Sequence, residues 1–105
     1  NTIRGAVASW AKTLSYEVGL DGITVNNILP GFTDTERLAS LIDLKSVNQN
    51  ISSKDIATAM KSTVPAGRFG NPQETAKAIA FLASPSASYI NGVSIAVDGG
   101  RLSCI

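Results

Sequence analysis

The chain contains no histidine and a single cysteine, Cys104. Histidine is the commonest general base and metal ligand, and one cysteine makes neither an internal disulfide nor a zinc site. We therefore expect no metal site and a reducing, cytoplasmic location. No apolar run approaches the roughly 20 residues that span a bilayer, so the sequence predicts no membrane partner.

Charge of either sign is also scarce and nearly balanced. Nine Lys and Arg stand against eight Asp and Glu in 105 residues, without a basic run. This argues against a nucleic-acid partner. The length allows one domain with a real core. Because the chain opens on Asn1, inside a helical pattern, we expect it to be a piece of a longer protein.

The most informative stretch covers residues 23–31 (ITVNNILPG). Residues 23–29 form a β-branched, apolar run of the kind found in parallel strands that are buried on both faces. Pro30 lacks an N–H and Gly31 permits unusual backbone angles, so strand pairing is expected to stop there. Open α/β sheets bind ligands beyond the carboxyl ends of their strands. Residues after Gly31 are therefore expected to face a ligand.

Residues 1–19 predict an amphipathic helix with Gly19 as its C-cap. Its apolar face should pack on the sheet. A second face of small residues, including Gly5 and Ala8, would let another helix approach closely. Together with the final strand, this face favours a homo-oligomer.

Two shorter helices are expected between residues 33 and 65. Thr33 begins a capping-box pattern, which makes it the expected N-cap of the first. Residues 45–53 are polar and predict a loop. Ser52 or Ser53 then caps the second helix.

The last third predicts a helix followed by a strand. Asn71 is an N-cap residue, with proline at the first helical position and Glu74 three residues on. The helix should stop near Ser84, and Asn91 precedes a turn glycine. Alternating apolar residues then predict a strand over residues 93–97. A strand, a helical crossover and a second strand make a βαβ unit.

These motifs resemble, in order and spacing, those of the short-chain dehydrogenase/reductase family. The closest likeness within it is to the 3-oxoacyl-carrier-protein reductase type. The segments that carry the resemblance are residues 26–35 (NNILPGFTDT), 68–74 (RFGNPQE), 81–84 (FLAS), 89–92 (YING) and 97–100 (VDGG).

The resemblance implies an α/β fold. Residues 1–105 would form the C-terminal part of a Rossmann-like, doubly wound parallel sheet, with its last two strands and flanking helices. The helices at about 34–63 would be the substrate lid, although they could simply cover the sheet end. The implied activity is NAD- or NADP-dependent reduction of a ketone or oxidation of a secondary alcohol. The implied partners are a small carbonyl or alcohol substrate, the upstream half of the same domain, and further copies of the protein.

The sequence also departs from the family pattern. It contains no G-x-x-x-G-x-G phosphate loop. The family's catalytic pair is Tyr-x-x-x-Lys; Arg4 takes the lysine position, and the tyrosine would lie before Asn1. Neither Tyr16 nor Tyr89 rebuilds the pair, so no catalytic residue is assigned. The alternative function is therefore a catalytically inactive family member, or a fragment, that serves as a binding or oligomerisation scaffold.

Five residues are cofactor-binding candidates by resemblance: Arg4, Pro30, Gly31, Thr33 and Thr35. Arg4 could hold the nicotinamide ribose, although a planar guanidinium differs from a lysine ammonium; it could equally be solvated or touch another subunit. Pro30 and Gly31 could face the nicotinamide or merely end a strand. The backbone near Thr33 would meet the carboxamide. Thr35 would reach the pyrophosphate at a helix N-terminus.

Overall fold

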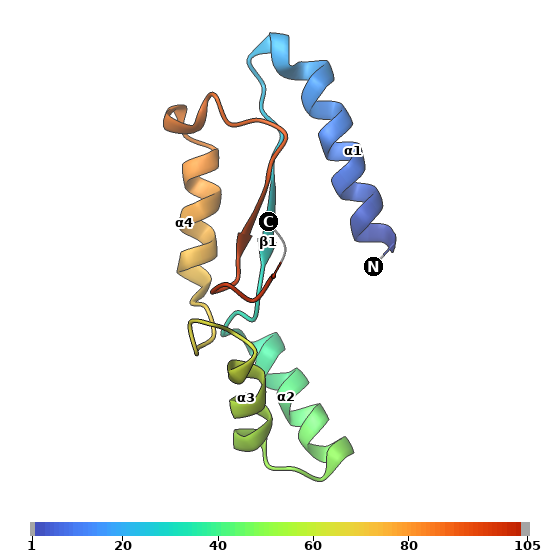
Figure 1. Ribbon diagram of the computed structural model, residues 1–105, viewed down its shortest axis with the longest axis vertical. Helices are drawn as coiled ribbons and strands as arrows, with labels where there is room; N and C mark the ends of the chain where they lie inside the picture. Colours follow the sequence, from blue (N-terminus) through green and yellow to red (C-terminus); the bar gives the residue numbers. More distant parts are fainter. Residues whose placement is uncertain (1, 104–105) are drawn as a thin grey trace. The chain divides into compact units, whose positions relative to one another are not determined.

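The computed structural model describes residues 2–103 as an α/β chain (Figure 1). In chain order the helices and strands are α1 (Thr2–Val18), β1 (Asn27–Pro30), α2 (Glu36–Gln49), α3 (Ser53–Ser62), α4 (Pro72–Leu82) and β2 (Ser94–Val97). The chain divides into two compact units, Asn1–Leu29 with Ala76–Ile95, and Pro30–Thr75 with Ala96–Ile105. Within the described residues, no helix has the length and apolar character needed to cross a membrane.

β1 and β2 pair in parallel, which confirms the predicted α/β class. The Asn27 N–H donates to the Val93 carbonyl (2.8 Å), and the Gly31 N–H donates to the Val97 carbonyl (3.0 Å). The strand ends at Pro30, as predicted, and the Gly31 N–H just beyond it makes one more bond to the end of β2. Alternate residues of a strand donate toward a given neighbour. Pro30 lies between two donors, so its missing N–H costs this strand pair nothing.

The first strand is shorter than predicted, because residues 23–26 are outside it. Asparagine side chains replace the ladder here. The Val25 N–H donates to Asn91 Oδ1 (2.9 Å), and the Val93 N–H donates to Asn26 Oδ1 (3.1 Å). An amide side chain supplies both a donor and an acceptor, so it can stand in for a peptide group. Asn26 and Asn91 therefore join the two chain segments just before β1 and β2.

Asn91 also reaches the first helix. Its Nδ2 donates to the carbonyl of Ser15 (3.0 Å), whose residue is almost fully buried. The same side chain thus binds the end of α1 and the approach to β1. Because the amide bonds to two backbone groups at once, Asn91 fixes the helix to the strand segment.

The end of α1 differs from the prediction that Gly19 caps it. The chain tightens into a short 3₁₀ turn, Gly19–Asp21, and the left-handed residue is Gly22 (φ 75°). The Gly22 N–H donates to the Gly19 carbonyl (3.1 Å). One extra turn therefore separates the helix from the strand segment.

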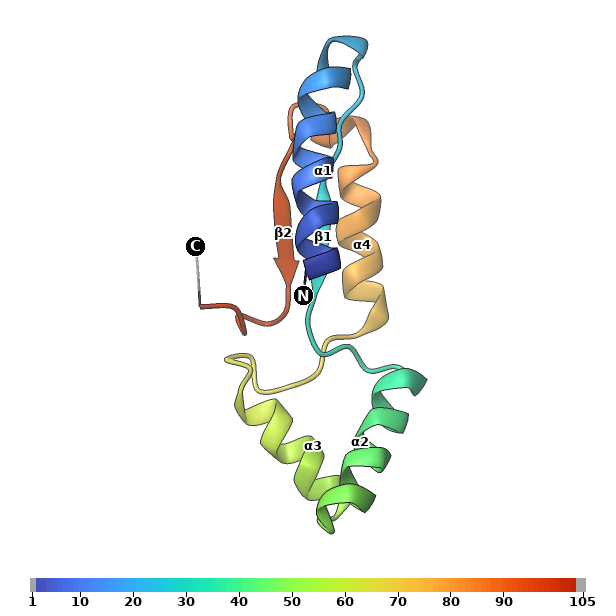
Figure 2. The same ribbon diagram turned by 90° about the vertical axis from the view of Figure 1, so that its right-hand side faces the viewer.

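Within the first unit, α1 and α4 cover opposite faces of the strands (Figures 1 and 2). On α1, Ala11 and Ser15 are buried. The predicted apolar face is only partly covered, since Ile3 and Trp10 are 75% and 62% exposed. The face turned inward is thus built from small residues, and larger apolar side chains remain on the surface.

In the second unit, α2 and α3 pack as a pair with their own core. Leu38 and Ile42 from α2 meet Ile56 and Met60 from α3. Ser52 caps α3 as predicted, its side chain accepting from the Asp55 N–H. This small core is what holds the two helices together.

The loop predicted over residues 45–53 is largely wrong, because α2 continues to Gln49. The polar residues after position 45 are therefore compatible with a helix. It ends where Asn50 adopts a left-handed conformation (φ 53°) and donates its N–H to the Ser46 carbonyl. Asparagine tolerates this conformation better than other side chains, apart from glycine.

Candidate functional site

The candidate site is the segment that follows β1. At its start, Gly31 approaches Asp98 at the end of β2. A Cβ on Gly31 would lie 2.6 Å from the Asp98 Cβ and 2.7 Å from its Cα. These separations are shorter than any van der Waals contact, so only glycine fits. Pro30, just before it, is exposed on the surface.

The two threonines of the segment have different roles. Thr33 Oγ1 donates to the Gly31 carbonyl (3.1 Å), whereas Thr35 Oγ1 accepts from the Leu38 N–H (3.3 Å). Thr35 is therefore the N-cap of α2, and the prediction that Thr33 caps it is wrong. Thr33 and Thr35 both lie just before Glu36 in the sequence. The capping pattern alone therefore does not show which of the two caps the helix.

Gly70 fixes the same segment from the other side. Its N–H donates to the Phe32 carbonyl (2.8 Å), and its carbonyl accepts from the Asp34 N–H (2.8 Å). Thr33 and Gly70 thereby form a parallel bridge. The segment at residues 31–35 is held between the end of β2 and the loop before α4, and this restraint is the preorganisation that a binding loop needs.

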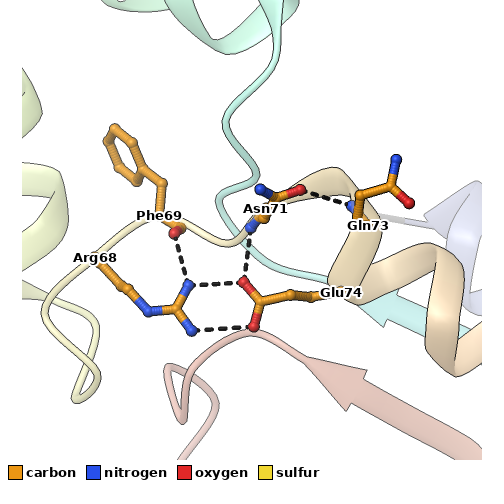
Figure 3. Close-up of polar contacts among 5 residues, drawn as sticks. All are labelled: Arg68, Phe69, Asn71, Gln73 and Glu74. Carbon is orange, nitrogen blue, oxygen red and sulfur yellow. Dashed lines mark hydrogen bonds and ion pairs between the residues drawn. The ribbon is translucent and has the colours of Figure 1, made fainter.

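An ion pair holds the loop before α4 (Figure 3). Arg68 binds both carboxylate oxygens of Glu74 (2.7 and 3.0 Å), and this raises the pKa of Arg68. Glu74 also accepts from the Asn71 N–H, while Asn71 Oδ1 accepts from the Gln73 N–H. This is the predicted capping arrangement. The pair is exposed, so its contribution to stability is small and its effect is to orient the loop.

Asp98 closes the other side of the site. Its carboxylate accepts from the N–H groups of Leu102 and Gly100, both at 2.9 Å. These bonds favour the charged form and lower the pKa of Asp98 from its ordinary 3.8. The carboxylate therefore organises the turn after β2.

This lowered pKa predicts a pH-dependent contribution to stability. The contribution is fully present above the unfolded-state pKa and is lost as the pH falls through the folded-state pKa. Asp98→Asn should therefore be less stable than wild type at pH 7, and the gap should close as the pH falls below about 4. Urea unfolding of both proteins between pH 7 and 2.5 measures it. A gap that stays constant over this range would contradict the prediction.

The hollow bounded by Phe32, Arg68, Gly70 and Asp98 is small. Its volume is about 60 Å³, well below the roughly 300 Å³ at which ligand pockets begin. It does not hold a dinucleotide by itself. Among residues 2–103, no three His, Cys, Asp or Glu side chains gather where they could hold a metal ion.

The five cofactor candidates fall in different parts of the fold. Pro30, Gly31, Thr33 and Thr35 lie on one continuous segment of the second unit. Arg4 lies on α1, in the first unit. Cys104 lies outside the described residues.

Two aromatic residues beside the site, Phe32 and Phe69, received no role from the sequence. Their rings meet edge to face, with centroids 6.1 Å apart. Phe32 follows Gly31 and Phe69 precedes Gly70 in the sequence. This proximity to the site glycines is the sequence signal that could have identified them.

Comparison with known proteins matches residues 1–101 to the family described as enoyl-(acyl carrier protein) reductase. The 3-oxoacyl-[acyl-carrier-protein] reductase FabG of Vibrio cholerae is 40% identical over 97 residues, covering 92% of this chain and 35% of the relative. The short-chain reductase protein NovJ of Streptomyces niveus is 39% identical over 100 residues, covering 95% and 37%. The chain thus spans little more than a third of the length of these curated relatives.

Solved structures give the same picture. YwfH, an NADPH-dependent reductase involved in bacilysin biosynthesis, superposes with a TM-score of 0.92 at 33% identity, over 99% of this chain and 39% of YwfH. The F189W actinorhodin polyketide ketoreductase with NADPH gives 0.85 at 31% identity, over 93% and 38%.

Proposed function

Because this chain belongs to the short-chain dehydrogenase/reductase family, we propose that it contributes the nicotinamide-side loop and the lid helices of an NAD(P)-dependent oxidoreductase. The reaction is reduction of a ketone or oxidation of a secondary alcohol, with hydride carried by the nicotinamide. The observation that carries the proposal is the family match over residues 1–101. The share of the relatives covered supports a domain completed by an upstream half. The scarcity of cysteine supports a cytoplasmic location, and the exposed apolar side chains of α1 support a homo-oligomer.

Several features of the second unit support this role in binding a dinucleotide. Pro30 and Thr35 are exposed, and Gly31 has no side chain to block the approach of a ring. The Thr35 hydroxyl accepts from Leu38 and keeps its own proton to donate. The N-terminus of α2, which Thr35 caps, presents amides and a favourable dipole to a phosphate. In this proposal Pro30, Gly31 and Thr33 face the nicotinamide, Thr35 contacts the pyrophosphate, and α2 and α3 close over the substrate.

The proposal predicts a specific loss on Thr35→Ala. In the full-length protein we expect about tenfold weaker NADPH or NADH binding, since one charge-assisted hydrogen bond is lost. Ser52→Ala is the matched control, because Ser52 caps α3 in the same way and each change removes about 1 kcal/mol of capping. Fluorescence titration with both cofactors measures the difference. Equal cofactor affinity in the two variants would remove Thr35 from the site.

A catalytically inactive scaffold is the second candidate. Arg4, in place of the family's lysine, favours it, because a guanidinium does not deprotonate and is a fork rather than a compact ammonium. The two candidates differ in the residue four positions before Arg4 and in turnover with a panel of ketones. Tyrosine there, with cofactor consumption, supports the enzyme; cofactor binding without turnover supports the scaffold.

A further inference from the structure

Four side chains of the second unit form a continuous stack, which we call the Phe32–Phe69 stack. The Arg101 guanidinium lies 4.3 Å from the centre of the Phe32 ring, and Lys61 Nζ lies 5.1 Å from that of Phe69. The two rings meet at 77°. Edge-to-face rings and cations over ring faces are favourable arrangements. The four residues come from four separate segments, so the stack joins parts that are distant in sequence.

The stack connects the lid helices to the candidate cofactor loop. Phe32 and Phe69 both pack against the core between α2 and α3. Phe32 is also part of the loop, and its carbonyl accepts from the Gly70 N–H. Contacts that hold the Phe32 ring therefore restrain the backbone that it shares with Gly31 and Thr33, its neighbours in the chain.

Arg101 completes the connection from the segment after β2. Besides stacking on Phe32, its Nε donates to Oγ1 of Thr63, the C-cap of α3, at 3.4 Å. A planar guanidinium can stack on a ring and donate from its edge at the same time, which a lysine ammonium cannot do. The stack therefore binds the loop and the end of α3 through one side chain.

We propose that Arg101 is a positioning residue: through the Phe32–Phe69 stack it holds the loop at residues 31–35 in the geometry that receives the nicotinamide cofactor. This inference rests on the function proposed above and adds a residue that touches neither cofactor nor substrate. Arg101 contributes orientation of the loop, and the loop's own groups make the contacts. Replacing Arg101 should thus weaken cofactor binding, although no direct contact between the protein and the cofactor is added or removed.

The test uses the full-length protein with Arg101→Met and Arg101→Lys. Lys54→Met is the control, since Lys54 is an exposed cation at the other end of α3. Arg101→Met should raise the KM for NADPH or NADH about three- to tenfold. Hydrogen exchange should also speed up at the Asp34 amide, which is bonded to the Gly70 carbonyl. Arg101→Lys should fall between wild type and Arg101→Met, and Lys54→Met should match wild type.

The outcomes separate the two proposals. A lower Tm for Arg101→Met with unchanged KM and unchanged Asp34 exchange would make Arg101 merely structural and overturn the inference. If wild-type protein binds neither NADPH nor NADH, the proposed function fails. Hydrogen exchange alone then tests whether Arg101 holds the loop. Faster Asp34 exchange in Arg101→Met would support the loop-holding role of the stack, and equal exchange would overturn it.

Discussion

Gly31→Ala should destabilise the protein by about 3 kcal/mol, because an added methyl group would overlap the backbone of Asp98. The Cβ would meet Asp98 Cα at 2.7 Å, and backbone that directly follows a strand pair cannot turn aside as a flexible side chain can. The hydrogen bond from Gly31 to Val97 would have to lengthen. Because the same residue opens the proposed cofactor loop, NADPH or NADH affinity should fall together with stability. Denaturant unfolding and cofactor titration of the full-length variant measure both effects.

Gly70→Ala is the matched control. A Cβ at Gly70 would lie 3.6 Å from the Phe32 carbonyl oxygen, an ordinary contact. Its φ is not in the left-handed region. We expect a change of less than about 1 kcal/mol. If both alanine variants lose similar stability, close approach at Gly31 is not the reason that glycine stands there.

The second large effect is expected at the core of α2 and α3. Ile42→Ala should cost about 3 kcal/mol, from lost burial and the cavity left among Leu38, Ile56 and Met60. These few side chains are what hold the two helices together, so the loss should appear first as local opening of α2 and α3. Limited proteolysis near Asn50, compared with global unfolding in urea, distinguishes local from global loss.

Leu44→Ala supplies the comparison on the same helix. Leu44 is 58% exposed, whereas Ile42 is 8% exposed. Its truncation should change stability by less than about 0.5 kcal/mol. Substrate KM should rise with Ile42→Ala if α2 and α3 close over the substrate. An Ile42→Ala protein that resists proteolysis as well as wild type would refute a separate core for the two helices.

Local chemistry in the sequence predicted much of this fold. Alternation and β-branching located both strands, and the Asn71–Glu74 capping pattern located α4 with its hydrogen bonds. Ser52 was found in the same way. These patterns depend on residues that are close together in the chain, so they can be recognised in a single sequence.

Other differences between prediction and structure come from contacts between residues that are distant in the sequence. The strand begins late because Asn91 satisfies the backbone at Val25, 66 residues away. No periodicity near residue 25 records that bond. Likewise, Gly31 was considered for its backbone freedom, while the structure needs it for the close approach of Asp98. A glycine in the sequence is compatible with either requirement, unusual backbone angles or close approach of another chain segment. Only the packing in the structure distinguishes them.

The double role of Asn91 has a chemical consequence for an ageing protein. Hydrolysis of its amide would turn the donor that faces the Ser15 carbonyl into a carboxylate oxygen, so two acceptors would oppose each other. The other oxygen could still accept from Val25, but the helix would lose its bond to Asn91 and keep that from Lys12 to the Gly92 carbonyl. A single deamidation at this Asn-Gly step would therefore loosen the attachment of α1 while leaving the strand pair itself intact.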